Sequence, residues 1–333
     1  MQVPGVSAAV VAGLGTCLPS TKVDNASLPD HLDTSDEWIR TRTGISSRRR
    51  TAPDVSVNDL ACAAAANAMS SAGTGTVGAL ILATTTPERP CPPAAPEIAY
   101  RMGQGRIPAF DVSAVCSGFL YAAAAAGGLI TAGIVDSVLV VAAETYSRIV
   151  DPFDRSTAVL FGDGAGAVLL RRGSAGEQGA LLAFDLGSDG SGAELIRVPG
   201  AREQPTGERW FSMAGRKVYL QAVEQMTNSA LRVMKDCSWS PETLDLLVPH
   251  QANARIVEAV AKRLGLPPER ALCALAEVGN TAAASIPLAL AEATAAHELE
   301  PGDRTVLTAF GGGLTWASAA LVWPRLTAVH SEI

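Results

Sequence analysis

The chain has 333 residues, of which 48% are hydrophobic, 5% aromatic and 18% charged. This composition excludes a disordered chain, a collagen-like fibre and a small disulfide-bonded domain. The formal net charge of −7 gives the protein no general attraction for nucleic acid or for an anionic membrane, so neither is expected as a partner. About one residue in six is alanine, well above ordinary usage, so small side chains supply much of the apolar volume.

The sequence predicts neither a secretory signal nor a membrane span. The first residues, MQVPGVSAAVVAGLG, lack a basic segment and lead into a strand-like apolar run. Residues 119–135 are apolar or small, but this stretch is shorter than the ~20 residues that a span requires, so we expect a buried helix there. Six cysteines without a CxxC pair or a zinc-ligand spacing indicate free thiols in a cytoplasmic protein.

The predicted elements follow the same order in both halves of the chain: strand, loop, helix, strand, strand. In the first half they are expected at 79–83, 83–93, from 120, at 138–142 and at 158–170. In the second half they are expected at 244–248, 249–253, 285–296, 305–309 and 316–323. A duplicated α/β unit predicts two mixed sheets with helices between and outside them, and a helix between two sheets must be thin and apolar all round. We divide the chain into residues 1–172, which carry a candidate nucleophile, and residues 173–333, which carry a histidine and an asparagine.

The candidate nucleophile is Cys116, in the segment SAVCSGF between a predicted strand and the small-residue helix. This position would expose the thiol at a helix N-terminus, where the macrodipole and free backbone N–H groups favour a thiolate. A cysteine taken alone is more often a small buried apolar residue. The glycine-flanked turn and a suitable partner elsewhere favour the catalytic interpretation.

That partner is His250, which directly follows an apolar strand in the segment PHQAN, whereas the other three histidines lie in polar or terminal segments. Asn280, in VGNTAAAS, is predicted to occupy the second-half position that Cys116 occupies in the first. A pseudo-twofold packing of the halves would bring Cys116, His250 and Asn280 together.

Three further segments have two interpretations each. The glycines at 311–313 follow a strand and either present backbone N–H groups to an acyl oxygen or form a plain turn. The run GDGAGA at 162–167 lacks the GxGxxG spacing and indicates close strand packing rather than a nucleotide loop. The arginines at 48–50, preceded by Arg40 and Arg42, form either a solvated loop or a site for an anion such as phosphate.

Six motifs in order resemble the β-ketoacyl-acyl-carrier-protein synthase III enzymes of the thiolase superfamily, over about residues 7–323. They are DTSDEWIRTRTGISSRR, SAVCSGF, FGDGAGA, VPHQANARI, GNTAAAS and AFGGGLTW. The resemblance implies an α/β thiolase fold of five layers, αβαβα, a homodimer and ping-pong acyl transfer. Coenzyme A or phosphopantetheine thioesters would be the substrates, and no metal or redox cofactor would be required.

The resemblance also implies catalytic roles. Cys116 would attack an acyl thioester, and the backbone N–H groups of Cys116 and Gly312 would hold the acyl oxygen. His250 and Asn280 would then donate hydrogen bonds to the thioester carbonyl of a malonyl carrier protein. Decarboxylation would yield an enolate that these donors stabilise, and the enolate carbon would attack the acyl group on Cys116.

Further resemblances concern substrate binding. Trp38 and Arg155 resemble the pair that sandwiches the adenine of coenzyme A, and Arg42 resembles the contact to its phosphates. The residues that resemble the pantetheine tunnel are Asn253, Gly215 and Tyr219. A basic helix face resembles the docking site for the acidic carrier protein, although a solvated face is equally consistent; it comprises Arg255, Lys262 and Arg263.

The chain departs from the family at Cys91, where a large apolar residue often reaches across the dimer to close the acyl pocket. A smaller side chain there implies a roomier pocket and a larger acyl group, which suits either fatty acid synthesis or a polyketide or other specialised pathway. An alternative to condensation is transfer of the acyl group from Cys116 to a hydroxyl or amine, with His250 as general base. Retention of Asn280 favours condensation, and the intact set of three residues disfavours a non-catalytic scaffold.

Overall fold

A computed structural model describes residues 7–333, so the part of the signal-peptide prediction that concerns residues 1–6 lies outside the described residues. Within this range the strands form one sheet in the order β14-β1-β7-β6-β4-β5 and a second in the order β11-β12-β13-β8. The strands of the first sheet are β1 (Ser7–Leu18), β4 (Ala79–Ala83), β5 (Ala109–Val112), β6 (Ser137–Thr145), β7 (Asp163–Ser174) and β14 (Val329–Glu332). Those of the second are β8 (Leu181–Ser188), β11 (Leu246–Pro249), β12 (Arg304–Gly311) and β13 (Thr315–Val322). Two short ribbons pair β2 (Lys22–Asp24) with β3 (Ser47–Arg49), and β9 (Ile196–Arg197) with β10 (Ser212–Met213).

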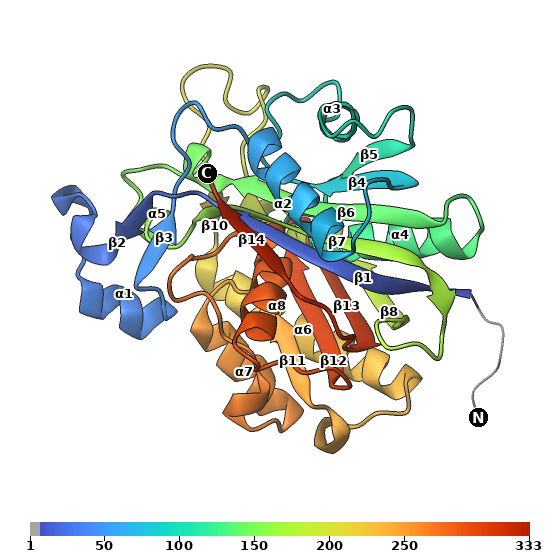
Figure 1. Cartoon of the computed structure of the whole chain (residues 1–333). Coiled ribbons are helices and arrows are strands. Elements are labelled where there is room, and N and C mark those ends of the chain that lie inside the picture. The colour runs from blue at the N-terminus through green and yellow to red at the C-terminus, as the bar shows by residue number, and fades with distance from the viewer. Residues whose placement is uncertain (1–6) are drawn as a thin grey trace.

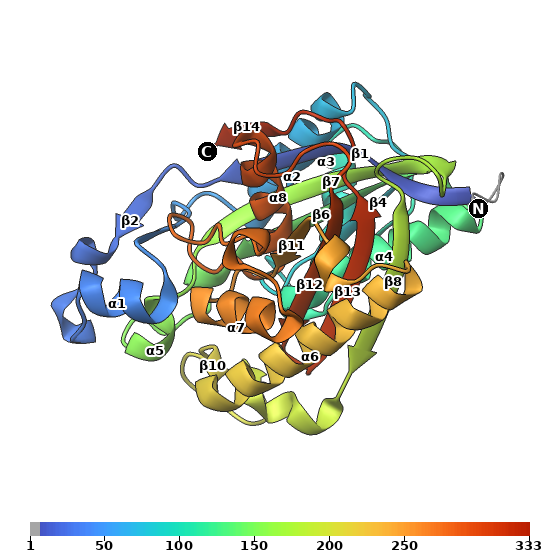
Figure 2. The ribbon, with the colours of Figure 1, turned by 90° about the horizontal axis from the view of Figure 1, so that it is seen from below.

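Helices cover both sheets and separate them, which gives the five predicted layers (Figures 1 and 2). The outer face of the first sheet packs on α2 (Val57–Ser71) and α3 (Ala95–Arg101). Between the sheets lie α4 (Gly118–Thr131) and α8 (Ser285–Ala295). The outer face of the second sheet packs on α6 (Gly215–Asp236) and α7 (Ala254–Leu264). Two shorter helices, α1 (Asp36–Thr43) and α5 (Arg155–Ala158), lie beside these layers.

The duplication is visible in the numbering of the central elements. One constant spacing separates the first residues of β4 and β11, of the 3₁₀ turns η3 (Val115–Ser117) and η8 (Ala282–Ala284), of α4 and α8, and of β6 and β12. This confirms the predicted order of elements. One boundary was wrong: residues 158–162 are not strand, because Ala158 ends α5 and β7 begins only at Asp163. The division of the chain at residues 172 and 173 stays a prediction.

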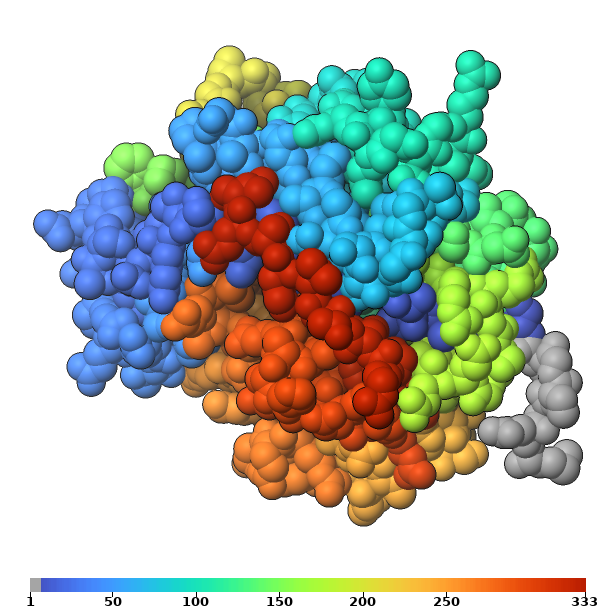
Figure 3. Space-filling model, in the orientation of Figure 1, coloured from blue at the N-terminus to red at the C-terminus, as the bar shows by residue number. Residues whose placement is uncertain are grey.

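The C-terminal strand β14 was not predicted. It runs parallel to β1, with Gly15 beside Val329 and Leu18 beside Glu332. Figure 3 shows this segment in red, lying across the boundary between the blue N-terminal and the orange C-terminal parts of the surface. Strands β14 and β1 are therefore neighbours in the first sheet. No helix within residues 7–333 is long and apolar enough to cross a membrane.

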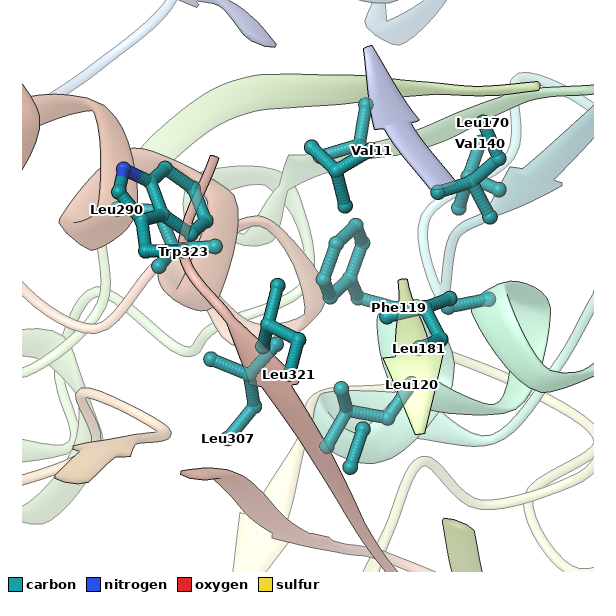
Figure 4. A pocket seen from close by; sticks show the side chains of 13 residues that line it. Val11, Phe119, Leu120, Val140, Leu170, Leu181, Leu290, Leu307, Leu321 and Trp323 are labelled. Carbon is teal, nitrogen blue, oxygen red and sulfur yellow. The ribbon is translucent and has the colours of Figure 1, made fainter. Parts of the chain in front are cut away.

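The middle layer is almost completely filled. Alanine and glycine dominate α4, which is buried along most of its length between the sheets, as predicted. One void of about 20 Å³ remains, lined only by apolar side chains that include Phe119, Leu307 and Trp323 (Figure 4). This volume holds no more than about one water molecule, and none of the candidate catalytic residues lines it. We therefore interpret it as a packing defect and not as a substrate site.

Glycines allow the layers to approach closely where a side chain would not fit. A Cβ atom at Gly166 would lie 2.7 Å from Pro287 of α8, and one at Gly162 would lie 2.1 Å from the Val278 carbonyl oxygen. Close packing is therefore the confirmed role of the GDGAGA run. On the other face of the sheet, a Cβ at Gly15 would lie 2.1 Å from the backbone nitrogen of Ala68 in α2.

We predict that Gly15→Ala lowers the free energy of unfolding by at least about 2 kcal/mol, because α2 must move away from β1 to admit the methyl group. Gly128→Ala is the matched control, since a Cβ at this exposed position of α4 meets nothing within 4 Å. It should raise the stability by about 0.5–1 kcal/mol. Urea unfolding of the two variants measures both changes, and equal stabilities would contradict the prediction.

Candidate functional site

Cys116 lies in the η3 turn between β5 and α4. The preceding residue, Val115, has a φ of 48°, a left-handed conformation that a β-branched side chain rarely adopts. Such strain costs about 1–3 kcal/mol and persists only where the surroundings enforce it. Here Ser117 enforces it, because its hydroxyl donates to the Ala114 carbonyl oxygen at 2.8 Å and contacts the Thr315 hydroxyl at 2.8 Å.

The predicted exposed thiolate is wrong for the resting protein. Cys116 is half-buried, and burial raises the pKa of its thiol well above the ordinary value, with a further increase from the Glu144 carboxylate. The physical reason is that α4 begins between two sheets. Removal of water at that place disfavours the charged sulfur more than the end of the helix favours it.

The counterpart of the η3 turn in the second half is η8, where Ala282 has a φ of 47° at the position equivalent to Val115. The same spacing makes Ala283 the counterpart of Cys116, so the prediction that Asn280 occupies this position was wrong. Asn280 lies just before the turn, and its side-chain oxygen accepts a hydrogen bond from the Ala282 N–H at 2.9 Å. The amide Nδ2 donates to no residue among 7–333 and is free to bind a ligand.

His250 lies directly after β11 and is only 3% exposed. Its Nδ1 is 2.6 Å from the hydroxyl oxygen of Ser285, which also accepts from the Gln251 N–H at 3.3 Å. The Ser285 proton therefore points to Nδ1, and we assign the ring proton to Nε2. Burial lowers the pKa of His250 to about 3, so the ring is a neutral hydrogen-bond donor.

The contact between the η3 and η8 turns brings these three residues together. Asn280 lies two residues before η8, and Ser285, the partner of His250, directly follows it. On the other side, a Cβ at Gly118, two residues after Cys116, would lie 3.6 Å from the Cβ of Ala283. Sequence reasoning quoted the motif that contains Ser285 but missed its role, because a serine at the start of a helix has no special signal.

The glycines at 311–313 lie against the nucleophile turn. A Cβ at Gly311 would lie 2.8 Å from the backbone nitrogen of Cys116 and would cover this donor. The Thr315 hydroxyl is 3.1 Å from the carbonyl oxygens of both Ala114 and Gly312, so it holds the two loops together. The backbone N–H groups of Cys116 and Gly312 donate to no other residue in the described part of the chain. Both are therefore available to an oxyanion.

A cation–aromatic cluster lies at the edge of the molecule beside α1. The guanidinium carbons of Arg42 and Arg155 lie 4.9 and 5.3 Å from the ring centroid of Trp38. Arg155 also donates to the Asp33 carbonyl oxygen at 2.6 Å. The structure thus brings together the three residues that the sequence assigned to a nucleotide.

Asn253 connects this cluster to α7. Its side chain caps the helix by accepting from the Arg255 N–H at 2.9 Å, and it donates to the Arg42 carbonyl oxygen at 3.2 Å. One apolar cluster contains both Trp38 and Cys116, together with Ile196, Phe211, Met213 and Ala254. The two ends of the predicted tunnel therefore share one continuous set of contacts. Gly215 begins α6 and Tyr219 is 37% exposed, and their role as tunnel walls stays a prediction.

The arginine run divides into structural and exposed members. Arg48 is fully buried and donates to the side-chain oxygen of Asn25 and to the carbonyl oxygens of Val23 and Val159. Burial lowers its pKa to about 10. Arg49 forms an ion pair with Glu332 of β14 at 3.1 Å. Arg48 and Arg49 therefore bind other parts of the protein through their terminal nitrogens, which favours a structural role over an anion site for these two residues.

The remaining predicted residues lie on the surface. Arg255, Lys262 and Arg263 are exposed on α7, and the exposed Glu258 lies between them along the helix. Cys91 is exposed in the loop between β4 and α3. Within residues 7–333, no group of three or more histidine, cysteine, aspartate or glutamate side chains could hold a metal ion.

Comparison with known proteins gives consistent matches. The 3-oxoacyl-[acyl-carrier-protein] synthase III family matches residues 110–190, and its C-terminal family matches residues 234–323. The chain is 53% identical over 330 residues to beta-ketoacyl-[acyl-carrier-protein] synthase III 5 of Streptomyces coelicolor, covering 97% of this chain and 99% of that one. It is similar to the crystal structure of 3-oxoacyl-(acyl carrier protein) synthase III from Pseudomonas aeruginosa, with a TM-score of 0.92, 50% identity, and coverage of 96% and 99%. It is also similar to the priming β-ketosynthase of the R1128 polyketide pathway, with a TM-score of 0.88, 32% identity, and coverage of 98% and 99%.

The buried His250 predicts a specific dependence of stability on pH. The unfolded chain binds a proton at this residue below about pH 6.5, whereas the folded protein does so only near pH 3. Stability is therefore lost as the pH falls through this window. Between pH 6.5 and 5, the wild-type protein should lose about 1.5 kcal/mol more than His250→Asn. Denaturant unfolding at the two pH values measures this difference, and equal losses would show that His250 titrates normally in the folded protein.

Proposed function

Because the chain belongs to the β-ketoacyl-acyl-carrier-protein synthase III family of the thiolase superfamily, we propose that it joins an acyl group to a malonyl carrier protein by decarboxylative condensation. The observation that carries this proposal is the contact between the η3 and η8 turns. Through this contact the turn that carries Cys116 meets the turn that lies between Asn280 and Ser285, the partner of His250, which supports a site made of a thiol, two free backbone N–H groups and two neutral side-chain donors. These are the groups that a thioester condensation requires.

In the loading step, the sulfur of Cys116 attacks the carbonyl carbon of an acyl thioester. Negative charge develops on the carbonyl oxygen, where the N–H groups of Cys116 and Gly312 stabilise it. The carbon–sulfur bond of the donor breaks, and the donor leaves as a thiol that carries the proton of Cys116. The rigid turn around Val115 holds the sulfur in place for this attack.

In the condensing step, His250 Nε2 and Asn280 Nδ2 donate to the thioester oxygen of the malonyl group. Loss of carbon dioxide leaves an enolate, whose charge rests on that oxygen and is stabilised by the same donors. The enolate carbon attacks the acyl carbon, a carbon–carbon bond forms, and the carbon–sulfur bond to Cys116 breaks. The Cys116 thiolate then takes a proton from water, which restores the thiol. The mechanism needs no metal and no redox cofactor.

The alternative, transfer of the acyl group to a hydroxyl or amine, requires a general base near neutral pH. A histidine with a pKa of about 3 is a weak base, whereas condensation uses the neutral ring as a donor. Retention of the Asn280 donor also supports condensation. We therefore assign the transfer reaction second place.

Several surface features support the partners that the family uses. Trp38, Arg42 and Arg155 lie in one cluster, which supports a nucleotide site there, with an adenine taking the place of a guanidinium group on the Trp38 ring. The exposed basic face of α7 begins beside this cluster and suits an acidic carrier protein.

Strand β5 is an edge strand with the partly exposed Phe110, and pairing with β5 of a second copy would form the homodimer. Cys91 of the second copy would then line the acyl pocket. The free thiols of all six cysteines suit a reducing cytoplasm.

We predict that Cys116→Ala abolishes acyl loading, because the hydroxyl of Ser117, the other nucleophilic group of the η3 turn, is buried and engaged with Ala114 and Thr315. Intact-protein mass spectrometry after incubation with acetyl, branched and medium-chain acyl-CoA measures the mass gain. A mass gain in the variant would refute the assignment of the nucleophile. Malonyl carrier protein added to loaded wild-type enzyme should release carbon dioxide, and turnover only with an alcohol or amine would favour the transfer reaction.

A second prediction concerns the nucleotide end of the substrate. Trp38→Ala should raise KM for acyl-CoA about 5- to 30-fold with kcat unchanged, because stacking on the ring contributes about 1–2 kcal/mol. The matched control is the same variant with acyl-pantetheine, which lacks the nucleotide and should keep the wild-type KM. An equal rise with both donors would mean that Trp38 supports the fold of α1 rather than the adenine.

A further inference from the structure

A buried carboxyl group near Cys116 takes no part in the steps described above. Glu144, the penultimate residue of β6, is fully buried and forms no ion pair within residues 7–333. Its carboxylate accepts hydrogen bonds from the Thr85 N–H at 3.0 Å and from the Thr86 hydroxyl at 2.8 Å. The Thr86 hydroxyl in turn accepts from the Thr145 N–H at 2.9 Å, so the carboxylate is held in a single position.

The duplication explains why Glu144 faces the nucleophile turn. By the spacing that relates the two halves, Glu144 is the counterpart of Gly311, whose backbone lies against the Cys116 N–H. Correspondingly, Glu144 lies against the backbone of Ala283, the counterpart of Cys116. Because the η3 and η8 turns contact each other, the carboxylate and the thiol lie on either side of this contact.

Within residues 7–333, no basic side chain forms an ion pair with Glu144 or affects the ionisation of Cys116. The Glu144 carboxylate acts on the Cys116 thiol, and both groups act on Tyr146, which follows β6 and packs in the same apolar cluster as Cys116. His250, at the end of β11, is neutral. Burial raises the pKa of Glu144 to about 7. Two negative charges in such a place repel each other strongly, so ionisation of one group suppresses ionisation of the other.

Three buried hydroxyl groups in this region, of Thr85, Tyr146 and Thr281, make no hydrogen bond of good geometry, but the Thr85 hydroxyl lies close to both the Glu144 carboxylate and the Tyr146 hydroxyl. Buried hydroxyls are normally well paired, so a group of poorly paired ones calls for an explanation. A hydroxyl can both accept and donate a proton. The Tyr146 and Thr85 hydroxyls are therefore suited to carry a proton between the sulfur and the carboxylate.

We propose that Glu144 is a positioning residue that controls the protonation of Cys116, because the two buried groups share a single negative charge. In the resting protein the charge resides on the Glu144 carboxylate and the proton on the sulfur. As the sulfur attacks a thioester, its proton passes to Glu144, and the departing thiolate later takes this proton, which restores the carboxylate. The proton transfer during attack on a thioester rests on the proposed function. The sharing of one negative charge by Glu144 and Cys116 does not.

The test measures alkylation of Cys116 by iodoacetamide, which needs no substrate of the enzyme. The rate is followed by mass spectrometry from about pH 6 to pH 10, for wild type, Glu144→Gln and the control Glu292→Gln. Burial also raises the pKa of Glu292, but this residue lies in α8 far along the helix from η8. The wild-type rate should be half-maximal above the ordinary thiol pKa of about 8.5. Glu144→Gln should lower this midpoint by at least about one pH unit.

The expected gain in rate at pH 7 is about threefold per unit of midpoint shift, because the more acidic thiolate is also a weaker nucleophile. Glu292→Gln should match wild type. A wild-type midpoint at or below 8.5, or a midpoint unchanged in Glu144→Gln, would overturn the proposal. If Glu144→Gln does not fold, Thr86→Val replaces it as the test. This variant removes a hydrogen bond that stabilises the charged Glu144 carboxylate. It should therefore lower the midpoint of Cys116 alkylation as well, by a smaller amount.

The outcome is separable from that of the proposed function. Alkylation reports only the state of the thiol, whereas acyl loading and carbon dioxide release report the reaction. A shifted midpoint together with absent condensation would support the shared charge and refute the proposed function. An unshifted midpoint together with normal condensation would refute the shared charge and support the proposed function.

Discussion

The contact between the η3 and η8 turns is the constraint on which the site depends. Each turn enters a helix of the middle layer, and each begins with a non-glycine residue in the left-handed region, Val115 in one half and Ala282 in the other. This conformation is unfavourable for the isolated segment and is held by tertiary contacts, among them the hydroxyls of Ser117 and Thr315. The two turns occupy equivalent places in the duplicated halves, and one presents a thiol while the other is flanked by Asn280 and by Ser285, the partner of His250.

Burial determines the chemical character of this site. The same removal of water that raises the pKa of Cys116 lowers that of His250, so the resting site is neutral except where a carboxylate is retained. A neutral histidine and an amide are suited to donate hydrogen bonds to an oxygen that becomes negative. The backbone N–H groups of Cys116 and Gly312 are free to serve the same purpose for an acyl oxygen. In the proposed reaction, dipoles instead of cations would stabilise the developing negative charge.

The abundance of alanine and glycine has its explanation in the middle layer. Helices α4 and α8 lie between the two sheets, and small residues on them reduce the space that the layer needs. Glycines of β1 and β7 allow α2 and α8 to touch the first sheet from its two faces. The contact of α8 with β7 brings the helix that follows η8 close to the first sheet.

The sequence by itself determined the order of the elements and, through its resemblance to a family, the five layers, because periodicity, small-residue content and ordered motifs are local properties. It also singled out Cys116, His250 and Asn280 as candidate catalytic residues. It also identified Trp38, Arg42 and Arg155, which the structure joins in one cluster. It placed the start of β7 too early and did not reveal β14, because four residues at the chain end have no periodic signal.

Only the tertiary structure decided the charge states and the supporting contacts. The thiol expected to ionise at a helix end is held neutral, and Arg48, a candidate anion site, is buried against carbonyl oxygens. The roles of Ser285, Thr315 and Glu144 likewise depend on residues far away in the chain. Desolvation and long-range hydrogen bonds arise only when distant segments pack together, and no local pattern of residues contains that information.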